Sequence, residues 1–457
     1  MINKILGWFQ RVAKSKLASK FARDAVLLQI AAIVNTGLNF VTSIVLFRGL
    51  GVDGYGEYAE ALTLYTFIFF VGNVGFSQLA IARVAEAMGR GSEGDVTRWL
   101  GFFYKAYGIL SFTLAVGGFI VLPAIGNYIF GDTKIGLLGA YLGMQGLISL
   151  PFYLVQCALT GTRRMRILAE MENLKELVRA YLIISLTLSI GDPRGAIAGE
   201  VAGAIFSIPL AILAYKKATA EPGMMLPGLR EILKQSREIN GKEIIEMAKK
   251  GALLSVNKNF QALMPTVFPR LVLGYFAGHR EVGYLNLGQN LMKLPLQGLQ
   301  GVSRAIMPAL GQLRGAGQED RLRSFLVKVM TLSGLSIMFA TAVWGVLLYF
   351  AIPIFYGDSA RPVLPLLWWL FIANTIAGFA VGSEAFFIVV DKIDVAVKIS
   401  LIFVSFSIPI GYALISKWHT EGAAAFVALV HGSAATSVCY IIYYLSKRRA
   451  ETPRLDA

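Results

Sequence analysis

Residues 286–304 read NLGQNLMKLPLQGLQGVSR and place a polar stripe along one face of a predicted α-helix. Four amides and two cations, spaced three or four residues apart, form this stripe: Asn286, Asn290, Lys293, Gln297, Gln300 and Arg304. At about 1.5 Å per residue the stripe is roughly 27 Å long, close to the thickness of the hydrocarbon core of a bilayer. Pro295 and Pro308 are expected to bend or end this helix.

The composition of the whole chain is that of a membrane protein. Of its 457 residues, 56% are hydrophobic and 16% are charged, whereas a soluble domain has about 45–50% apolar and 25% charged residues. Apolar segments long enough to span a membrane are predicted at residues 25–46, 57–82, 99–125, 136–160, 174–190, 196–215, 250–274, 282–308, 325–352, 362–390, 395–416 and 423–445. The polar stripe cannot face lipid in such a protein, so we expect it to line a wet interior.

Lysine and arginine are distributed unevenly over the loops between these segments. With the N-terminus assigned to the cytoplasm, the loops and ends on that side carry about 31 of them and the opposite loops about 6. We expect an inner-membrane protein, and the positive-inside rule predicts that both of its termini lie in the cytoplasm. In a soluble protein the net charge of +15 would suggest nucleic acid as a partner. Here the loop asymmetry accounts for most of the charge, and we expect no such partner.

The two halves of the sequence carry matching glycine landmarks. At an offset of 226 or 227 residues, Gly51 and Gly56 match Gly278 and Gly283, and Gly131 with Asp132 matches Gly357 with Asp358. An internal duplication with an even number of spans in each copy predicts an all-α polytopic protein of about 12 transmembrane helices. Its two six-helix bundles should be related by a pseudo-two-fold axis along the membrane normal and surround a central cavity.

Composition also suggests the domain boundaries. The expected parts are a basic arm at 1–24, a first bundle at 25–215, a cytoplasmic linker helix at 216–249, a second bundle at 250–445 and a basic tail at 446–457. The arm is either an interfacial helix on the anionic inner leaflet or a disordered basic segment.

Four short motifs, in this order and spacing, resemble those of the polysaccharide-repeat flippases, a family of the multidrug/oligosaccharidyl-lipid/polysaccharide exporter superfamily. They are RGLGVDGYGEYAEAL at 48–62, NVGFSQLAIARVAEA at 73–87, GYFAGHREVGYLNLGQNL at 274–291 and PIFYGDSARPVLPLL at 353–367. The resemblance extends from about Ile30 to Ile442. It implies two six-helix bundles around a cavity that opens alternately to either side, and transport of a lipid-diphosphate-linked oligosaccharide from the inner to the outer leaflet.

The interior of such a flippase has to accept a diphosphate and sugar hydroxyls. Lysine and arginine suit the phosphates, and amides suit the hydroxyls because they both donate and accept hydrogen bonds. The expected substrate-binding residues are Lys258, Arg270, Asn290, Lys293, Gln297, Gln300, Arg304, Asn35 and Asn39. Lys293 and Arg304 are about 16 Å apart along the helix axis and would hold the diphosphate at successive depths.

Several charged residues within the predicted spans have more than one interpretation. Lys105 and Arg179 lie near the ends of their spans, where a long side chain can also extend to the interface. The acids clearly inside the spans are Glu200 and Glu384, which would either pair with cations or carry a coupling proton or sodium ion. No nucleotide-binding loop, catalytic group or metal-ligand cluster is recognised, so we expect no cofactor beyond such a coupling ion.

Three other functions compete with a flippase. A cation-coupled multidrug antiporter of the same superfamily would be expected to have an acidic interior, whereas this interior holds more cations than acids. A membrane glycosyltransferase or polymerase would need a large catalytic loop, and the outer loops are short. A structural scaffold would leave the buried charges unexplained. We therefore expect a monomeric transporter, not an enzyme. Its expected partners are its lipid-linked substrate and membrane lipids, with other polysaccharide-assembly proteins as candidates for further partners.

Overall fold

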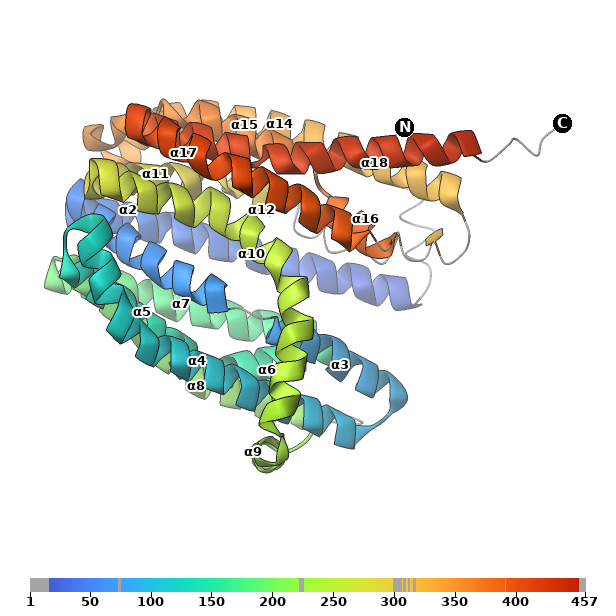
Figure 1. The fold of residues 1–457 in the computed structure, drawn as a ribbon. Helices are drawn as coiled ribbons and strands as arrows, with labels where there is room; N and C mark the ends of the chain where they lie inside the picture. Colours follow the sequence, from blue (N-terminus) through green and yellow to red (C-terminus); the bar gives the residue numbers. More distant parts are fainter. Residues whose placement is uncertain are drawn as a thin grey trace.

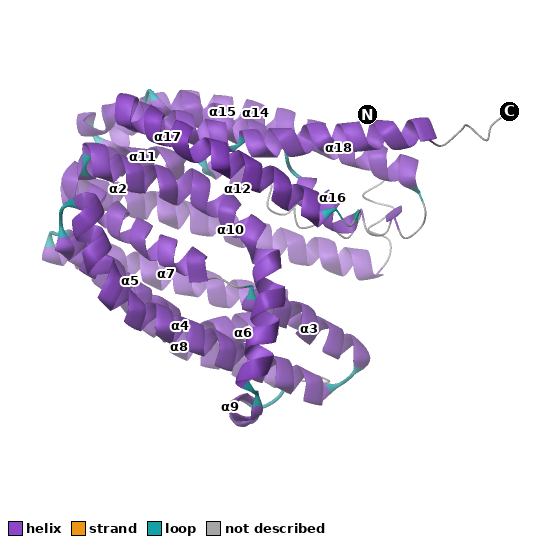
Figure 2. Cartoon of the chain, in the orientation of Figure 1, coloured by secondary structure: helices purple, strands orange, loops and turns teal. Residues whose placement is uncertain are grey.

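A computed structural model of the chain describes residues 16–72, 75–221, 226–298, 318–390 and 392–451, together with positions 306, 310, 313 and 314. Within these residues the regular structure is helical, with no β-strand (Figure 2). The first half contains α2 (Lys16–Gly72), α3 (Phe76–Arg90), α4 (Glu93–Phe130), α5 (Thr133–Ile148), α6 (Leu150–Gly161), α7 (Met165–Ile190) and α8 (Pro193–Thr219).

The helix α9 (Leu229–Glu238) lies between the halves in sequence. The second half contains α10 (Gly241–Ala277), α11 (His279–Met292), α12 (Leu294–Gln297), α14 (Glu319–Tyr356), the 3-10 helix η1 (Asp358–Val363), α15 (Leu366–Phe379), α16 (Ser383–Val389), α17 (Ile393–Val430) and α18 (Gly432–Glu451). The predicted break of the polar stripe at Pro295 is confirmed, because α11 ends at Met292 and Pro295 lies in the first turn of α12. Pro308 lies outside the described residues.

Two of the long helices contain a sharp turn. The backbone of α2 leaves the helical region at Gly51 (φ 68°, ψ −179°), and that of α17 does so at His419 (φ 45°, ψ −119°). Each of these elements is therefore two helices joined at one residue. Each of these two turns separates two predicted spans, whereas the 48° bend between α5 and α6 lies inside the single predicted span 136–160.

Six described helical segments are long and apolar enough to cross a membrane, or seven if α5 and α6 count as one. Two of the six, Ile33–Phe70 and Asp394–Lys447, include the turns at Gly51 and His419 and so each hold two predicted spans. The remaining predicted spans lie on α7, on α10, and on α11 together with α12. Charged and amide side chains lower the hydropathy of these helices. The chain is a multi-pass membrane protein, and the predicted all-α fold class is confirmed.

The apolar cores show how the halves are joined. One core mixes both halves, with Phe47 and Tyr55 beside Leu285 and Leu291. It lies at the end of the molecule that carries Gly51 and Gly278, which we call the turn end. At the opposite end, the linker end, one core belongs to the first half with α9 and the start of α10, and a separate core around Phe386 belongs to the second half. The two bundles thus meet at the turn end and diverge toward the linker end (Figure 1).

The linker helix is attached to the first bundle. The Nζ of Lys105 on α4 donates hydrogen bonds to the carbonyl oxygens of Ile239, at 2.7 Å, and Arg237, at 3.4 Å, and so caps the end of α9. From Gly241 the chain continues as α10, which starts within the predicted linker and runs on to pack along α17 (Figure 1). The last part of the predicted linker, from Gly241, and the seventh predicted span are therefore one continuous helix.

The predicted repeat is visible in the backbone. Gly51 and its counterpart Gly278 have nearly the same conformation, with φ 68° and ψ −179° in the first and φ 82° and ψ −174° in the second. The helices that follow them, the second part of α2 and α11, pack on each other through the matched pair Gly56 and Gly283. Matched residues in mutual contact are what a two-fold axis produces, so the pseudo-two-fold axis passes near this crossing.

Candidate functional site

A polar cavity of about 400 Å³ lies between the two halves. Its walls come from α2, α5, α7 and α8 of the first half and from α11 and α12 of the second. The lining includes Thr36, Asn39, Phe40, Thr42, Ser43, Tyr55, Tyr58, Gln145, Lys175, Glu176, Arg179, Glu200, Asn286, Asn290, Lys293 and Gln297. The volume is within the usual range for a small-molecule site, and hydroxyl, amide and charged groups dominate the lining.

The wall formed by the second half carries the predicted polar stripe. Asn286, Asn290, Lys293 and Gln297 all line the cavity. The Nδ2 of Asn290 donates to the Oδ1 of Asn286 at 3.3 Å, and the Nδ2 of Asn286 donates to the Tyr55 hydroxyl at 3.1 Å. Gln297 accepts a hydrogen bond from the Thr36 hydroxyl of the first half. The amides are thus held by neighbours, whereas the ammonium group of Lys293 makes no ion pair with any described residue.

Arg270 lies behind this wall instead of on the cavity surface. Its side chain is buried, and its Nε and Nη2 both donate to the Oε1 of Gln289, at 3.1 and 2.6 Å. The Nε2 of Gln289 in turn donates to the carbonyl oxygen of Pro265 at 2.8 Å. Because no described acid pairs with Arg270, its charge adds to the positive potential behind Lys293.

The wall formed by the first half carries a charge cluster centred on Arg179. Its Nη1 donates to the Oε1 of Glu200 at 2.7 Å, its Nε to the Oε2 of Glu176 at 2.8 Å, and its Nη2 to the Oδ1 of Asn39 at 2.8 Å. Arg179 comes from α7 and Glu200 from α8. Every donor nitrogen of this guanidinium therefore has an acceptor, and Asn39, predicted as a substrate contact, is engaged with it.

Both acids of this cluster have further partners. The Tyr58 hydroxyl donates to the Oε1 of Glu200 at 3.2 Å, and the Nε2 of Gln145 donates to its Oε2 at 3.2 Å. The Nζ of Lys175 lies 3.7 Å from the Oε1 of Glu176 and 4.6 Å from the centre of the Phe152 ring. The carboxylates would therefore keep some of their partners if Arg179 moved away.

The sequence prediction of two acids inside the spans was incomplete. Glu176 lines the cavity, and Glu60, in the second predicted span, is fully buried. Three cations and two acids line the described wall: Lys175, Arg179, Lys293, Glu176 and Glu200. Among the described lining residues the cations thus exceed the acids, and the cation without an ion pair is Lys293. The signal that could have found the cluster is the Lys175, Glu176, Arg179 spacing, which puts all three near one face of α7.

The remaining predicted residues lie elsewhere. Asn35 is half-buried outside the cavity lining, and its Oδ1 has no hydrogen-bond partner in the described structure. Glu384 is exposed at the start of α16 and forms no ion pair with a described residue, whereas Glu200 is paired with Arg179. Lys258 belongs to α10, but its side chain is outside the described part, as are Gln300 and Arg304. Over the described residues no group of three or more histidine, cysteine or acidic side chains could hold a metal ion.

The sequence matches the family described as polysaccharide biosynthesis protein over residues 21–314. The chain belongs to this family. No curated protein matches the sequence.

Solved transporters of the MOP superfamily share the fold. A multidrug resistance MATE family transporter in an inward-facing conformation aligns with a TM-score of 0.73 and 13% identity, covering 93% of this chain and 100% of that one. An outward-facing structure of a transporter with the same description aligns with a TM-score of 0.64 and 13% identity. The alignment covers 94% of this chain and 96% of that one. A third structure is a MOP superfamily transporter from Pyrococcus furiosus, described as having a binding pocket of reverse polarity. It aligns with a TM-score of 0.65 and 13% identity, and the alignment covers 93% of this chain and 95% of that one.

Proposed function

We propose that this protein is a flippase that moves a lipid-diphosphate-linked oligosaccharide from the inner to the outer leaflet by alternating access. The observation that carries the proposal is Lys293, a cation without an ionic partner among the described residues, on the wall of a polar cavity between two bundles. Membership of the polysaccharide biosynthesis protein family supports the substrate class. The proposed activity is transport alone, without a chemical reaction and without a cofactor.

The charge of the substrate explains why such a cavity is needed. A diphosphate carries about two negative charges, and moving it through hydrocarbon without compensation costs far more than thermal energy. An ammonium group in a wet cavity lowers that barrier because it attracts the phosphates without a rigid geometry. The amides of Asn286, Asn290 and Gln297 beside Lys293 can bind sugar hydroxyls.

Arg179 is proposed as a second phosphate ligand that exchanges partners during transport. In the present conformation Glu200 and Glu176 occupy its donors. A diphosphate can replace Glu200, because that carboxylate retains hydrogen bonds from Tyr58 and Gln145. Arginine binds phosphate in a bidentate manner and would then face Lys293 across the cavity. The exchange makes binding selective for a strong anion, since a weaker ligand would not compete with the resident carboxylates.

The proposed orientation places the linker end in the cytoplasm. The charge asymmetry of about 31 cations against about 6 supports it. Separate cores at the linker end and a shared core at the turn end support a cavity that opens at the linker end, which the proposal assigns to the cytoplasm. The higher TM-score with the inward-facing transporter, 0.73 against 0.64 for the outward-facing one, supports the same assignment.

The alternative is a cation-coupled multidrug antiporter. Glu176 and Glu200 on the cavity wall favour it, because acids are the groups that would bind a cationic drug or a coupling ion. Their engagement by Arg179 and Lys175 counts against it. The Pyrococcus furiosus transporter, whose pocket of reverse polarity is described as suggesting a different function, shows a precedent for this fold with another pocket charge.

A binding measurement separates the two functions. Purified protein in lipid nanodiscs would be titrated with farnesyl diphosphate, farnesyl phosphate and the lipophilic cation tetraphenylphosphonium. The flippase proposal predicts preference for the diphosphate and at least a tenfold loss of that affinity in Lys293→Glu. Lys134→Glu is the matched control, because Lys134 is exposed at the turn end, away from the cavity. Binding of the cation with no binding of the diphosphate would favour the antiporter.

A further inference from the structure

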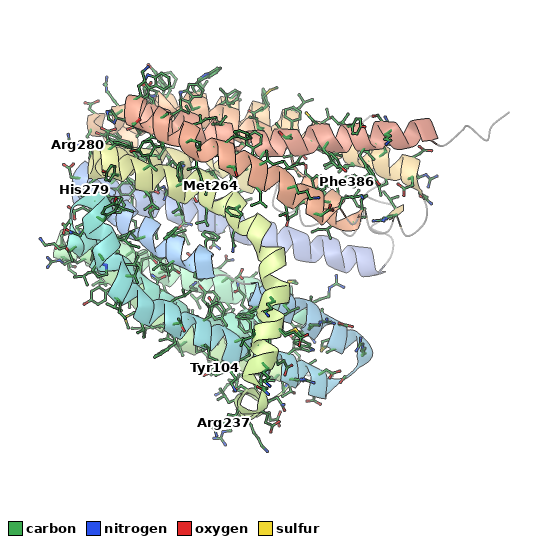
Figure 3. The ribbon with its side chains drawn as sticks, viewed as in Figure 1. Tyr104, Arg237, Met264, His279, Arg280 and Phe386 are labelled. Carbon is green, nitrogen blue, oxygen red and sulfur yellow. The ribbon has the colours of Figure 1, made fainter. Side chains whose placement is uncertain are left out.

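The contact between the halves at the turn end includes a pair of titratable groups, one of which is buried. The Nδ1 of His279, at the start of α11 (Figure 3), is hydrogen-bonded to the Oε2 of Glu60 on α2. The Glu60 side chain is fully buried, whereas the His279 side chain retains 32% of its exposure. The pair therefore links one residue from each half and remains in contact with the solution on one side.

The Glu60 carboxylate depends on this histidine. Its second oxygen, Oε1, is buried and has no hydrogen-bond partner in the described structure. The Gly274 backbone lies beside it, since a methyl group added to Gly274 would be 3.2 Å from that oxygen. The same methyl group would be 2.1 Å from the Phe130 ring, which packs against this glycine. A buried carboxylate with a single partner is costly unless that partner is charged, so the contact is strongest when His279 carries a proton.

The surrounding charges favour the proton on His279. Glu57 from α2 and Asp132 from the turn between α4 and α5 face the imidazole with the same sign as Glu60. Asp53 of α2 is also close, but it forms an ion pair with Arg280, the residue next to His279. Glu281, the next residue, accepts a hydrogen bond from Thr420 of α17. From α10 the neighbour is the backbone of Gly274.

We propose that Glu60 and His279 form a proton-operated latch, in which a proton on His279 ties the two halves together and holds the turn end shut. The latch concerns the conformation of the protein and does not depend on which substrate the cavity carries. It gives the turn end a response to the pH of the compartment it faces, because the partly exposed histidine can exchange protons without opening of the turn end.

The sign of the response follows from the contact. The hydrogen bond to Glu60 raises the pKa of His279 above its ordinary value of 6.5, although burial opposes this. When the halves separate, the histidine loses Glu60 and its pKa returns toward the ordinary value. The proton therefore binds more tightly to the shut state, which is stabilised at a pH below 6.5 and loses that stabilisation as the pH rises through the raised pKa.

The neighbouring pair supplies a matched control. Arg280 donates to Asp53 from Nε at 3.1 Å and from Nη2 at 2.9 Å, and it bridges the same two helices. Arginine stays charged throughout the range in which histidine titrates, and the pKa of Asp53 is lowered by its hydrogen bond to Arg280. Loss of this pair should change how tightly the turn end closes without removing its response to pH.

The test is a distance measurement across the turn end. Spin labels at Lys134→Cys and Lys417→Cys, both exposed and one in each half, would be placed in a Cys439→Ser background in lipid nanodiscs, with the buried Cys157 retained. Double electron–electron resonance would compare pH 5.5 with pH 8.5. In the parent protein we expect the ratio of the short-distance to the long-distance population to fall severalfold at the higher pH.

The variants decide the outcome. His279→Gln and Glu60→Gln should each give the same distance distribution at both pH values, whereas Arg280→Gln should retain the change. Two latch variants are used because either could fold poorly, and size-exclusion profiles identify which of them is usable. An unchanged distribution in the parent, or a full pH response in a folded latch variant, would overturn the proposal. Loss of the response in Arg280→Gln alone would also contradict it, because the titrating contact would then lie elsewhere.

Discussion

Arg280 forms an ion pair with Asp53, its own counterpart in the repeat. The two residues are 227 positions apart, the offset that also relates Gly51 to Gly278. A residue can touch its counterpart only beside a symmetry axis, so this pair marks the pseudo-two-fold axis at the turn end. Both side chains are more than half exposed, and exposed pairs contribute little stability. The pair therefore locates the axis, while the close packing beside it joins the halves.

The first prediction concerns that packing. A methyl group added to Gly56 would lie 2.0 Å from the carbonyl oxygen of His279, so the backbone of α11 would have to move. Gly56→Ala should lower stability by about 1–3 kcal/mol, as overpacking does, and increase the distance between the halves at the turn end. Thermal unfolding and the Lys134–Lys417 distance would measure both effects. Gly117→Ala is the control, because no atom lies within 4 Å of its added methyl group, and an equal effect there would contradict the account.

Much of this fold could be predicted from sequence because its strongest signals are local. Gly51 and Gly278 stand out as glycines in a repeated turn, and both have a positive φ. Pro295 predicts a helix break for the same kind of reason, since proline lacks the amide hydrogen that a helix interior needs. The continuity of α10 from the end of the predicted linker into the seventh predicted span could not be foreseen, because its charged first turns resemble a surface loop in hydropathy.

The second prediction concerns topology. A cysteine at Glu231, exposed on α9, should react with a membrane-impermeant maleimide only when the cytoplasmic side is accessible. A cysteine at Lys134, exposed at the turn end, should react from the opposite side. Both variants would carry Cys439→Ser to remove the exposed native thiol. If the linker position is labelled in intact cells whose inner membrane is sealed, the proposed orientation is wrong.

The third prediction concerns the competition between Glu200 and phosphate for Arg179. Glu200→Gln removes the negative charge that now occupies Nη1 of Arg179, while an amide oxygen can still accept from Tyr58. Farnesyl diphosphate should therefore bind several times more tightly to Glu200→Gln than to the parent. Arg179→Ala should bind it at least several times more weakly, with Arg179→Lys in between. Equal affinities across this series would remove Arg179 from the proposed site, even if Lys293 retained its role.

The site was less predictable than the fold, and the difference has a physical cause. Lys293 could be identified because a charge deep in an apolar segment must face water or a partner. Arg179 was open to a second interpretation, because a cation near the end of a span can extend to the interface. Its pairing with Glu200 depends on the packing of α7 against α8, which no local pattern specifies. Arg270 met the same criterion as Lys293, but the amide of Gln289 holds it behind the wall.

The fourth prediction concerns Lys293 in cells. In a strain that lacks its own flippase, Lys293→Ala should abolish surface polysaccharide with little loss of protein from the membrane. Lys293→Arg should retain part of the activity, since charge matters more than shape at a transit site, and Lys293→Glu should be worse than Ala. Surface polysaccharide would be compared with the amount of protein in the membrane. Normal polysaccharide in Lys293→Glu would indicate that the stripe is a packing seam between the halves.

Translocation in a purified system tests the flippase proposal most directly. Proteoliposomes would contain a fluorescent oligosaccharide linked to a polyprenyl diphosphate, and membrane-impermeant dithionite would quench the molecules that reach the outer leaflet. We expect the parent and Lys134→Glu to bring the inner-leaflet pool within reach of dithionite, whereas Lys293→Glu should leave that pool protected. If the parent leaves the pool protected, or if Lys293→Glu exposes it as fast as the parent, the proposed transport through a positively charged cavity is contradicted.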